Sequence, residues 1–162
     1  MIIGLTIPQF TALHVVLSLI GIAAGFVAMG AYMAGRWMPK MAALFLATTV
    51  ATTLGGFLFP IGAFTPALGV GIVSTIILAL ALVALYGYGL RGRARAVYAV
   101  TATIGLYLNT FVLIAQGFLK VPALHDLAPN GNEPAFLVAQ VALLALMLFM
   151  GWKAFRKTPL QA

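Results

Sequence analysis

The sequence contains no cysteine, and this absence removes several kinds of site at once. Disulfides, thiolate metal centres, iron–sulfur clusters and cysteine nucleophiles are all excluded. Charge is almost as scarce, since only 7% of the 162 residues are charged and only two are acidic. Soluble domains carry about 25% charged residues. This chain therefore lacks the charged groups that would cover a surface exposed to water.

The scarcity of acids also bears on catalysis. The two carboxylates, Asp126 and Glu133, lie outside the long apolar runs, so no carboxylate relay through a membrane is supported. The sequence has no glycine-rich phosphate loop, no His-Glu-x-x-His and no nucleophile elbow. These absences favour a non-catalytic role over an enzyme.

What the sequence does contain is apolar residues, which make up 64% of the chain. A membrane-spanning helix needs about 20 mostly apolar residues, and five stretches meet this need. The sequence predicts an all-α membrane bundle of five transmembrane helices, forming a single integral membrane domain over residues 1–162. The predicted spans cover residues 9–35, 41–59, 65–90, 96–119 and 135–152.

The basic residues predict the orientation of these spans. Eight of the nine lysines and arginines fall in three segments that five spans would place on one side: Arg36 and Lys40; Arg91, Arg93 and Arg95; Lys153, Arg156 and Lys157. The ninth, Lys120, would lie on the other side with both acids. Because basic loops stay inside, the N-terminus is predicted outside and the C-terminus inside. Nucleic-acid binding is not expected, because the net charge of +7 is split into short clusters rather than forming a stripe.

Polar residues inside the apolar runs are costly in lipid and are therefore informative. In the first span, "TALHVVLSLIGIAAGF", residues Thr11, His14, Ser18, Gly21 and Gly25 recur at steps of three and four. This spacing places them on one helical face. Gly21 and Gly25 would let another helix approach closely, and Thr48 and Thr52 of the second span are likewise interpreted as helix-packing residues.

The remaining polar residues gather in the predicted outer halves of the spans. They predict a polar recess that opens to the outer side between the first, fourth and fifth spans, above hydroxyls of the second and third. The candidate ligand-binding residues are His14, Ser18, Asn109, Gln116, Lys120 and Gln140. The outer-loop candidates His125, Asp126 and Glu133 form with Lys120 either a solvated loop of balanced charges or a lid over the recess.

His14 admits three interpretations. It can be neutral and hydrogen-bonded to Gln116, Gln140 or a loop carbonyl; it can bind a ligand or carry a proton in a wet recess; or it can ligate haem or a metal. The haem or metal interpretation is weakened because the chain offers few other metal-binding side chains: His125 is the one other histidine, and cysteine is absent. No metal site is predicted, and one chain cannot supply a haem with two histidines from two spans.

Three segments carry a resemblance to other proteins: "LHVVLSLIGIAAG", "ALFLATTVATTLGGFLFP" and "LYLNTFVLIAQGFLKVPALHDLAP". Together they resemble a group of short, uncharacterised bacterial inner-membrane proteins. The resemblance implies a multi-pass protein of the bacterial inner (plasma) membrane. It implies no activity, so no residue role is transferred.

Three functional hypotheses follow. The first is a small binding or accessory subunit with an outward-facing polar recess, held in a homo-oligomer or a larger membrane complex through its small-residue faces. The second is a redox subunit that places a quinone or haem near His14, Asn109 and Gln116. The third is a small-solute transporter or channel that acts as an oligomer, because the inner halves of the spans are apolar and offer no polar route within one chain.

Overall fold

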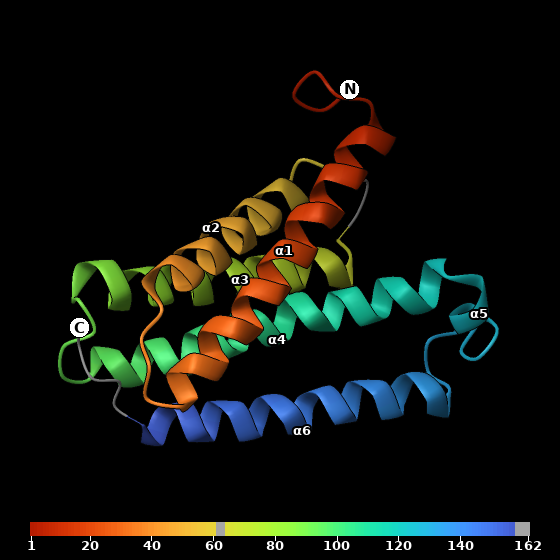
Figure 1. Cartoon of the computed structure of the whole chain (residues 1–162). Helices are drawn as coiled ribbons and strands as arrows, with labels where there is room; N and C mark the ends of the chain where they lie inside the picture. Colours follow the sequence, from red (N-terminus) through yellow and green to blue (C-terminus); the bar gives the residue numbers. More distant parts are fainter. Residues whose placement is uncertain (61–63, 158–162) are drawn as a thin grey trace.

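The computed structural model describes residues 1–60 and 64–157. Within them the chain forms long helices joined by short connections, as the sequence predicts (Figure 1). The long helices are α1 (Ile7–Met33), α2 (Pro39–Gly56), α3 (Pro66–Leu82), α4 (Ala94–Lys120) and α6 (Pro134–Arg156). A π-helical segment, η1 (Val83–Gly87), extends α3, and a short helix, α5 (Pro122–His125), follows α4.

Four helical segments of the described residues are long and apolar enough to cross a membrane. They are α1, the continuous segment Pro66–Gly87, α4 and α6. Helix α2 is not among these four. Its 18 residues include Lys40, four threonines and two glycines, which lower its mean hydropathy.

The helix starts follow from local sequence signals. At the start of α1, the Thr6 hydroxyl accepts a hydrogen bond from the Gln9 backbone N–H, and the Thr6 N–H donates to Gln9 Oε1 at 2.9 Å. This reciprocal pair satisfies two amide donors that a helix start otherwise leaves without partners. Proline stands at the first position of α2, α3 and α6, where its missing N–H costs no hydrogen bond.

Helix α4 is the centre of the bundle, since it packs against α1, α3 and α6 (Figure 1). Its buried face includes Tyr98, Ala102 and Leu106, none of which has measurable exposure. Helices α1 and α2 form a closely packed pair, and α6 runs beside α4. The contacts along α1 and α4 show that these two helices are antiparallel, because Tyr32 meets Tyr98 and Ser18 meets Asn109.

An aromatic cluster joins the end of α1 to the beginning of α4. The rings of Tyr32, Trp37 and Tyr98 lie with centroids 5.6–6.1 Å apart. The Tyr32 hydroxyl also donates to the Arg95 carbonyl oxygen at 3.3 Å. These contacts bring the α1–α2 loop to the same end of the bundle as the α3–α4 turn.

The α3–α4 turn is a tight connection with unusual backbone angles. Gly89, Leu90 and Gly92 all have φ between 53° and 55°, in the left-handed region. Leu90 adopts this conformation although it is not glycine, and two contacts hold it there. Its side chain is buried, and its carbonyl oxygen accepts a hydrogen bond from Arg95 Nε at 2.7 Å. This hydrogen bond holds the Arg95 side chain against the turn.

Three basic segments meet at this end of the bundle, which we call the basic end. They are the α1–α2 loop, the α3–α4 turn and the last turn of α6, where Gly151 packs near Thr103 of α4. The opposite end carries Lys120, α5 and both acids. The charge separation that the sequence suggested is thus present in the fold.

Candidate functional site

The polar face of α1 packs into the angle between α2 and α4. A Cβ atom on Gly21 would lie 2.9 Å from Thr48 Oγ1, 2.9 Å from Thr49 Oγ1 and 3.5 Å from Asn109 Nδ2. Glycine is therefore required for this approach, because a Cβ atom does not come within 3.0 Å of its neighbours without displacing them. Because glycine has no side chain, the polar groups of α2 and α4 face the α1 backbone directly.

One side-chain hydrogen bond joins α1 directly to α4 at this level. The Ser18 hydroxyl donates to Asn109 Oδ1 at 2.6 Å, which is short for a bond between neutral groups. In a lipid environment such a bond holds two helices together, although its net contribution is modest, at about 0.6 kcal/mol on average. The structure thus brings together two of the residues that sequence analysis proposed for ligand binding.

Several polar atoms beside this bond have no partner among the residues that the structure describes. They are Asn109 Nδ2, Thr49 Oγ1 and Thr52 Oγ1. Thr48 differs, because its hydroxyl donates to the Leu44 carbonyl of its own helix at 2.7 Å. Leaving a buried donor or acceptor without a partner costs roughly 1–3 kcal/mol. Three such atoms within one contact region make it the candidate site.

His14 lies one turn beyond Ser18, toward the start of α1. Its ring packs edge-on against Phe59 at 5.4 Å between centroids, and its Nδ1 faces Gly55 of α2. Nδ1 is buried and forms no hydrogen bond within residues 1–60 and 64–157. Because its ring contacts are with α2 and Phe59, His14 belongs to the same region as Thr52.

We call this region the polar seam and define it by His14 and Ser18 of α1, Thr49 and Thr52 of α2, and Asn109 of α4. It differs from the recess that the sequence predicted, which lay between the first, fourth and fifth spans. Helix α2 takes the place of the fifth span, because the His14 ring lies beside Gly55 and Gly56, where a Cβ atom would be 3.7 and 3.8 Å from the ring.

The other predicted ligand residues lie elsewhere. Gln140 is buried where α6 meets α4, and its Nε2 donates to the Phe111 carbonyl at 3.3 Å while its Oε1 has no partner in the described structure. Gln116 is half-buried on α4, and Lys120 is exposed at the end of that helix. His14 is therefore not bonded to Gln116 or Gln140, the two side-chain partners that sequence analysis offered for it.

The outer-loop candidates are largely exposed. His125 and Asp126 lie in and directly after α5, which packs against the end of α4 through Leu124 and Gly117. Among the residues that the structure describes, no three histidine or acidic side chains lie close enough together to hold a metal ion. The loop thus shows no metal centre within its described part.

Glu133 organises the end of this loop. Its Oε1 accepts from the Asn130 backbone N–H at 3.0 Å and from Asn130 Nδ2 at 2.7 Å, and its Oε2 accepts from the Asn132 N–H at 3.1 Å. Desolvation raises the pKa of this carboxyl, but the hydrogen bonds from Asn130, Asn132 and its own backbone together outweigh it. The net pKa of Glu133 is lowered from its ordinary value of 4.5.

This lowered pKa predicts how the loop responds to acid. A carboxylate whose folded pKa is depressed stabilises the loop above its ordinary pKa, and the contribution disappears as pH falls through the folded value. We therefore expect the Asn130 amide signal in NMR to titrate with a midpoint below 4.5. The Glu133→Gln variant should abolish that titration. A midpoint at or above the ordinary value would contradict the assignment.

Three residues of this region were not among the sequence-based candidates for binding: Thr49 and Thr52 of the seam, and Phe59, which contacts the His14 ring. Thr49 was passed over because hydroxyls within a span usually bond back to their own helix, as Thr48 does. Phe59 follows the end of α2, and no periodicity connects it to His14. The usable signal for Thr49 was its spacing, since Thr48 and Thr49 lie four and three residues before Thr52 and both share a helical face with it.

Comparisons with known proteins add no relative. No protein-family model matches the chain, and neither the curated proteins nor the solved structures contain a match.

Proposed function

We propose that this chain is a small membrane-embedded binding or accessory subunit that holds a small hydrogen-bonding group in the polar seam. One observation carries the proposal. Three helices bring Thr49 Oγ1, Thr52 Oγ1, Asn109 Nδ2 and His14 Nδ1 into one region, and each of these atoms lacks a partner among the described residues. Most buried polar atoms in native proteins have a partner, and an unpaired one calls for an explanation such as a bound ligand, an ion or an ordered water.

The proposed topology has five crossings, with the N-terminus outside and the C-terminus inside. Its support comes from charge placement and from α2. Helix α2 is about 27 Å long at 1.5 Å per residue, close to the ~30 Å hydrocarbon core. It also runs antiparallel to α1, since Phe45 meets Gly25 while Gly55 meets Phe10. A fifth crossing by α2 places all three basic segments on the inner side, as the positive-inside rule requires.

In this orientation the seam lies toward the outer side. His14 is about 10 Å along α1 from its first residue, and Ser18 is about 16 Å along it. The seam therefore extends from the outer third of the membrane to its middle. We place the protein in the bacterial inner membrane, where the outer side is the periplasmic one.

The chemistry of the seam favours a carbonyl or hydroxyl group as its partner rather than a large polar molecule. Its free atoms are hydroxyls, one amide nitrogen and one imidazole nitrogen, and the amide Nδ2 can only donate. The walls around them are apolar, with Phe45, Leu106 and Phe59 nearby. A ligand with a carbonyl-bearing head and an apolar body fits this environment.

The Thr49→Val variant tests the proposal. Valine keeps the shape of threonine but removes the unpaired hydroxyl, so the empty protein should be as stable as the parent or more stable by about 1–3 kcal/mol. Retention of the native ligand should fall, as measured by mass spectrometry of everything that co-purifies in mild detergent. Thr101→Val is the matched control, because the Thr101 hydroxyl is equally buried but donates to the Val97 carbonyl at 2.7 Å.

Two outcomes would overturn the binding proposal. One is a preparation in which no small molecule except bilayer lipid accompanies the parent protein. The other is a ligand that Thr49→Val, His14→Ala and Asn109→Leu all retain as well as the parent does. In either case the seam would be a helix contact only.

A quinone is the second candidate, favoured by two unpaired nitrogen atoms on different helices. Asn109 Nδ2 and, in one tautomer, His14 Nδ1 can each donate to a quinone carbonyl oxygen. Stoichiometric quinone in the parent preparation, lost in His14→Ala, would support this function. A haem absorption band would instead favour a haem-binding function with His14 as an axial ligand.

A further inference from the structure

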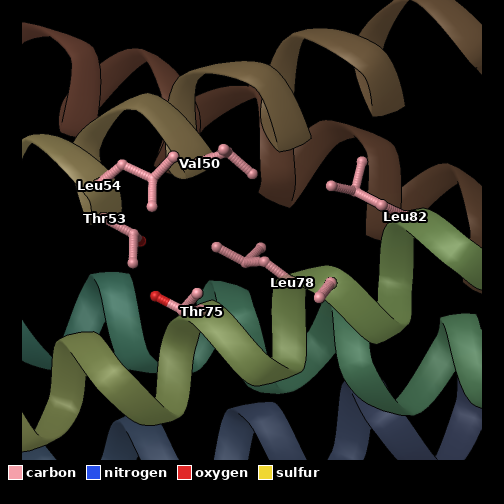
Figure 2. A pocket seen from close by; sticks show the side chains of 7 residues that line it. Val50, Thr53, Leu54, Thr75, Leu78 and Leu82 are labelled. Carbon is pink, nitrogen blue, oxygen red and sulfur yellow. The ribbon is translucent and has the colours of Figure 1, made fainter.

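A groove between α2 and α3 lies on the face of α2 next to the one that forms the polar seam. It encloses about 130 Å³, and Figure 2 shows Thr53 of α2 and Thr75 of α3 facing each other across it. The Thr75 hydroxyl donates to the Gly71 carbonyl at 2.8 Å and so presents no free donor. The rest of the lining consists of aliphatic side chains, among them Val50, Leu54, Leu78 and Leu82.

The groove is closed on one side and open on the other. Its floor is Leu78, which is 2% exposed and lies against Gly105 of α4, where a Cβ atom would meet Leu78 Cδ2 at 3.2 Å. At its mouth Leu54 is 51% exposed. Apolar cavities of about 150 Å³ stay dry and take up apolar ligands. On a membrane helix bundle, this mouth faces hydrocarbon chains.

The groove continues toward the basic end of the bundle. Leu82 is followed directly by η1 and then by the α3–α4 turn, where Arg91 and Arg93 are exposed. Arg95 is committed to the Leu90 carbonyl, so it is these two arginines that remain available to a ligand. Both acids of the chain lie at the opposite end, so no carboxylate competes for the two guanidinium groups.

Two exposed tyrosines place the turn at membrane-surface depth. Tyr86 and Tyr88 are 64% and 65% exposed, directly between the groove and the arginines. Tyrosine favours the level of the lipid headgroups. Along a helix, Leu82 and Arg91 are at most about 14 Å apart, which is within half of the ~30 Å hydrocarbon core. One lipid molecule can therefore reach both features.

We propose that the α2–α3 groove and the α3–α4 turn together bind one anionic phospholipid from the leaflet at the basic end. One acyl chain lies in the groove against Leu78, and the phosphate pairs with Arg91 and Arg93. The charge of the turn selects an anionic headgroup, and the apolar groove requires a hydrocarbon chain that free phosphate lacks. This site shares no side chain with the polar seam and stands independently of the proposed function.

The test uses the full chain in mild detergent, with phosphatidylglycerol and phosphatidylcholine of identical acyl chains added and bound lipid counted by native mass spectrometry. The parent should prefer phosphatidylglycerol. Each arginine near a membrane surface contributes about fivefold to binding of anionic lipid. Arg91→Gln combined with Arg93→Gln should therefore weaken phosphatidylglycerol binding by roughly 25-fold and leave phosphatidylcholine unchanged. Lys120→Gln, at the opposite end, is the charge control.

A second variant tests the groove. Ala79 lines it and is exposed, so Ala79→Phe should fill it and reduce retention of both lipids. Ala142→Phe, on the exposed face of α6, is the matched control and should retain both. Equal binding of the two lipids by the parent, an unchanged preference in the double arginine variant, or full retention by Ala79→Phe would each overturn the proposal. So would displacement of the bound lipid by inorganic phosphate alone.

Discussion

Replacing Gly25 with alanine should separate α1 from its two neighbours, whereas the same replacement at Gly30 should not. A Cβ atom at Gly25 would lie 2.7 Å from Leu106 Cδ1 and 2.8 Å from Phe45 Cδ2. Leu106 and Phe45 are both fully buried, so neither can move aside freely. At Gly30, on the same helix, a Cβ atom would meet nothing within 4 Å.

Comparing Gly25→Ala with Gly30→Ala isolates the effect of the steric clash on stability. Alanine is favoured over glycine in a helix by about 1 kcal/mol, and this gain is common to both variants. Overpacking costs about 1–3 kcal/mol, so Gly25→Ala should unfold that much more readily than Gly30→Ala in a detergent titration followed by helical circular dichroism. Equal stability of the two variants would mean that α1 does not approach α2 and α4 this closely.

Truncating Tyr98 to alanine should produce the largest loss of stability of any variant considered. Tyr98 is fully buried and its ring contacts both Tyr32 and Trp37, at centroid distances of 5.6 and 5.7 Å. Removing a buried aromatic ring costs about 3–5 kcal/mol. Tyr98→Phe should cost nothing and gain up to about 1–3 kcal/mol, because the Tyr98 hydroxyl has no hydrogen-bond partner among the described residues.

Trp37 provides the measurement. In a Trp152→Phe background it is the one remaining tryptophan, so its fluorescence reports on the aromatic cluster directly. Tyr98→Ala should shift this signal and the unfolding midpoint together. The control is Tyr88→Ala, 65% exposed and outside the cluster, which should change stability by no more than about 0.5 kcal/mol. A Tyr98→Ala protein as stable as Tyr88→Ala would contradict the packing described.

Helix positions were predictable because lipid imposes a single strong requirement, an apolar run of sufficient length. Each of the predicted runs overlaps one long helix, and the proline positions mark where α2, α3 and α6 begin. Hydropathy alone does not identify α2 as a membrane span, because two pairs of threonines interrupt its apolar residues. That α2 crosses the membrane is a proposal that rests on charge placement.

The composition of the site was predictable only in part. The spacing of His14, Ser18 and Gly21 placed them on one face, and Ser18 does meet Asn109 there. The sequence could not show which helix that face would meet, because helices that share lipid as a solvent carry no complementary hydrophobic pattern to identify their partners. Gln140 was therefore grouped with His14 by depth, although it lies at the α4–α6 contact.

The distance along the chain between Ser18 and Asn109 has a consequence for biosynthesis. The two bonded residues are 91 positions apart, and a ribosome adds about 5–20 residues per second. Ser18 must therefore wait roughly 5–20 seconds for Asn109, and during this time the hydroxyls of Ser18, Thr49 and Thr52 lack their neighbours on α4. We expect the nascent hairpin to stay beside the insertion machinery during this interval rather than diffuse into lipid. A ribosome-bound chain truncated after α3 should accordingly crosslink to the insertion site, whereas a chain extended beyond α4 should no longer do so.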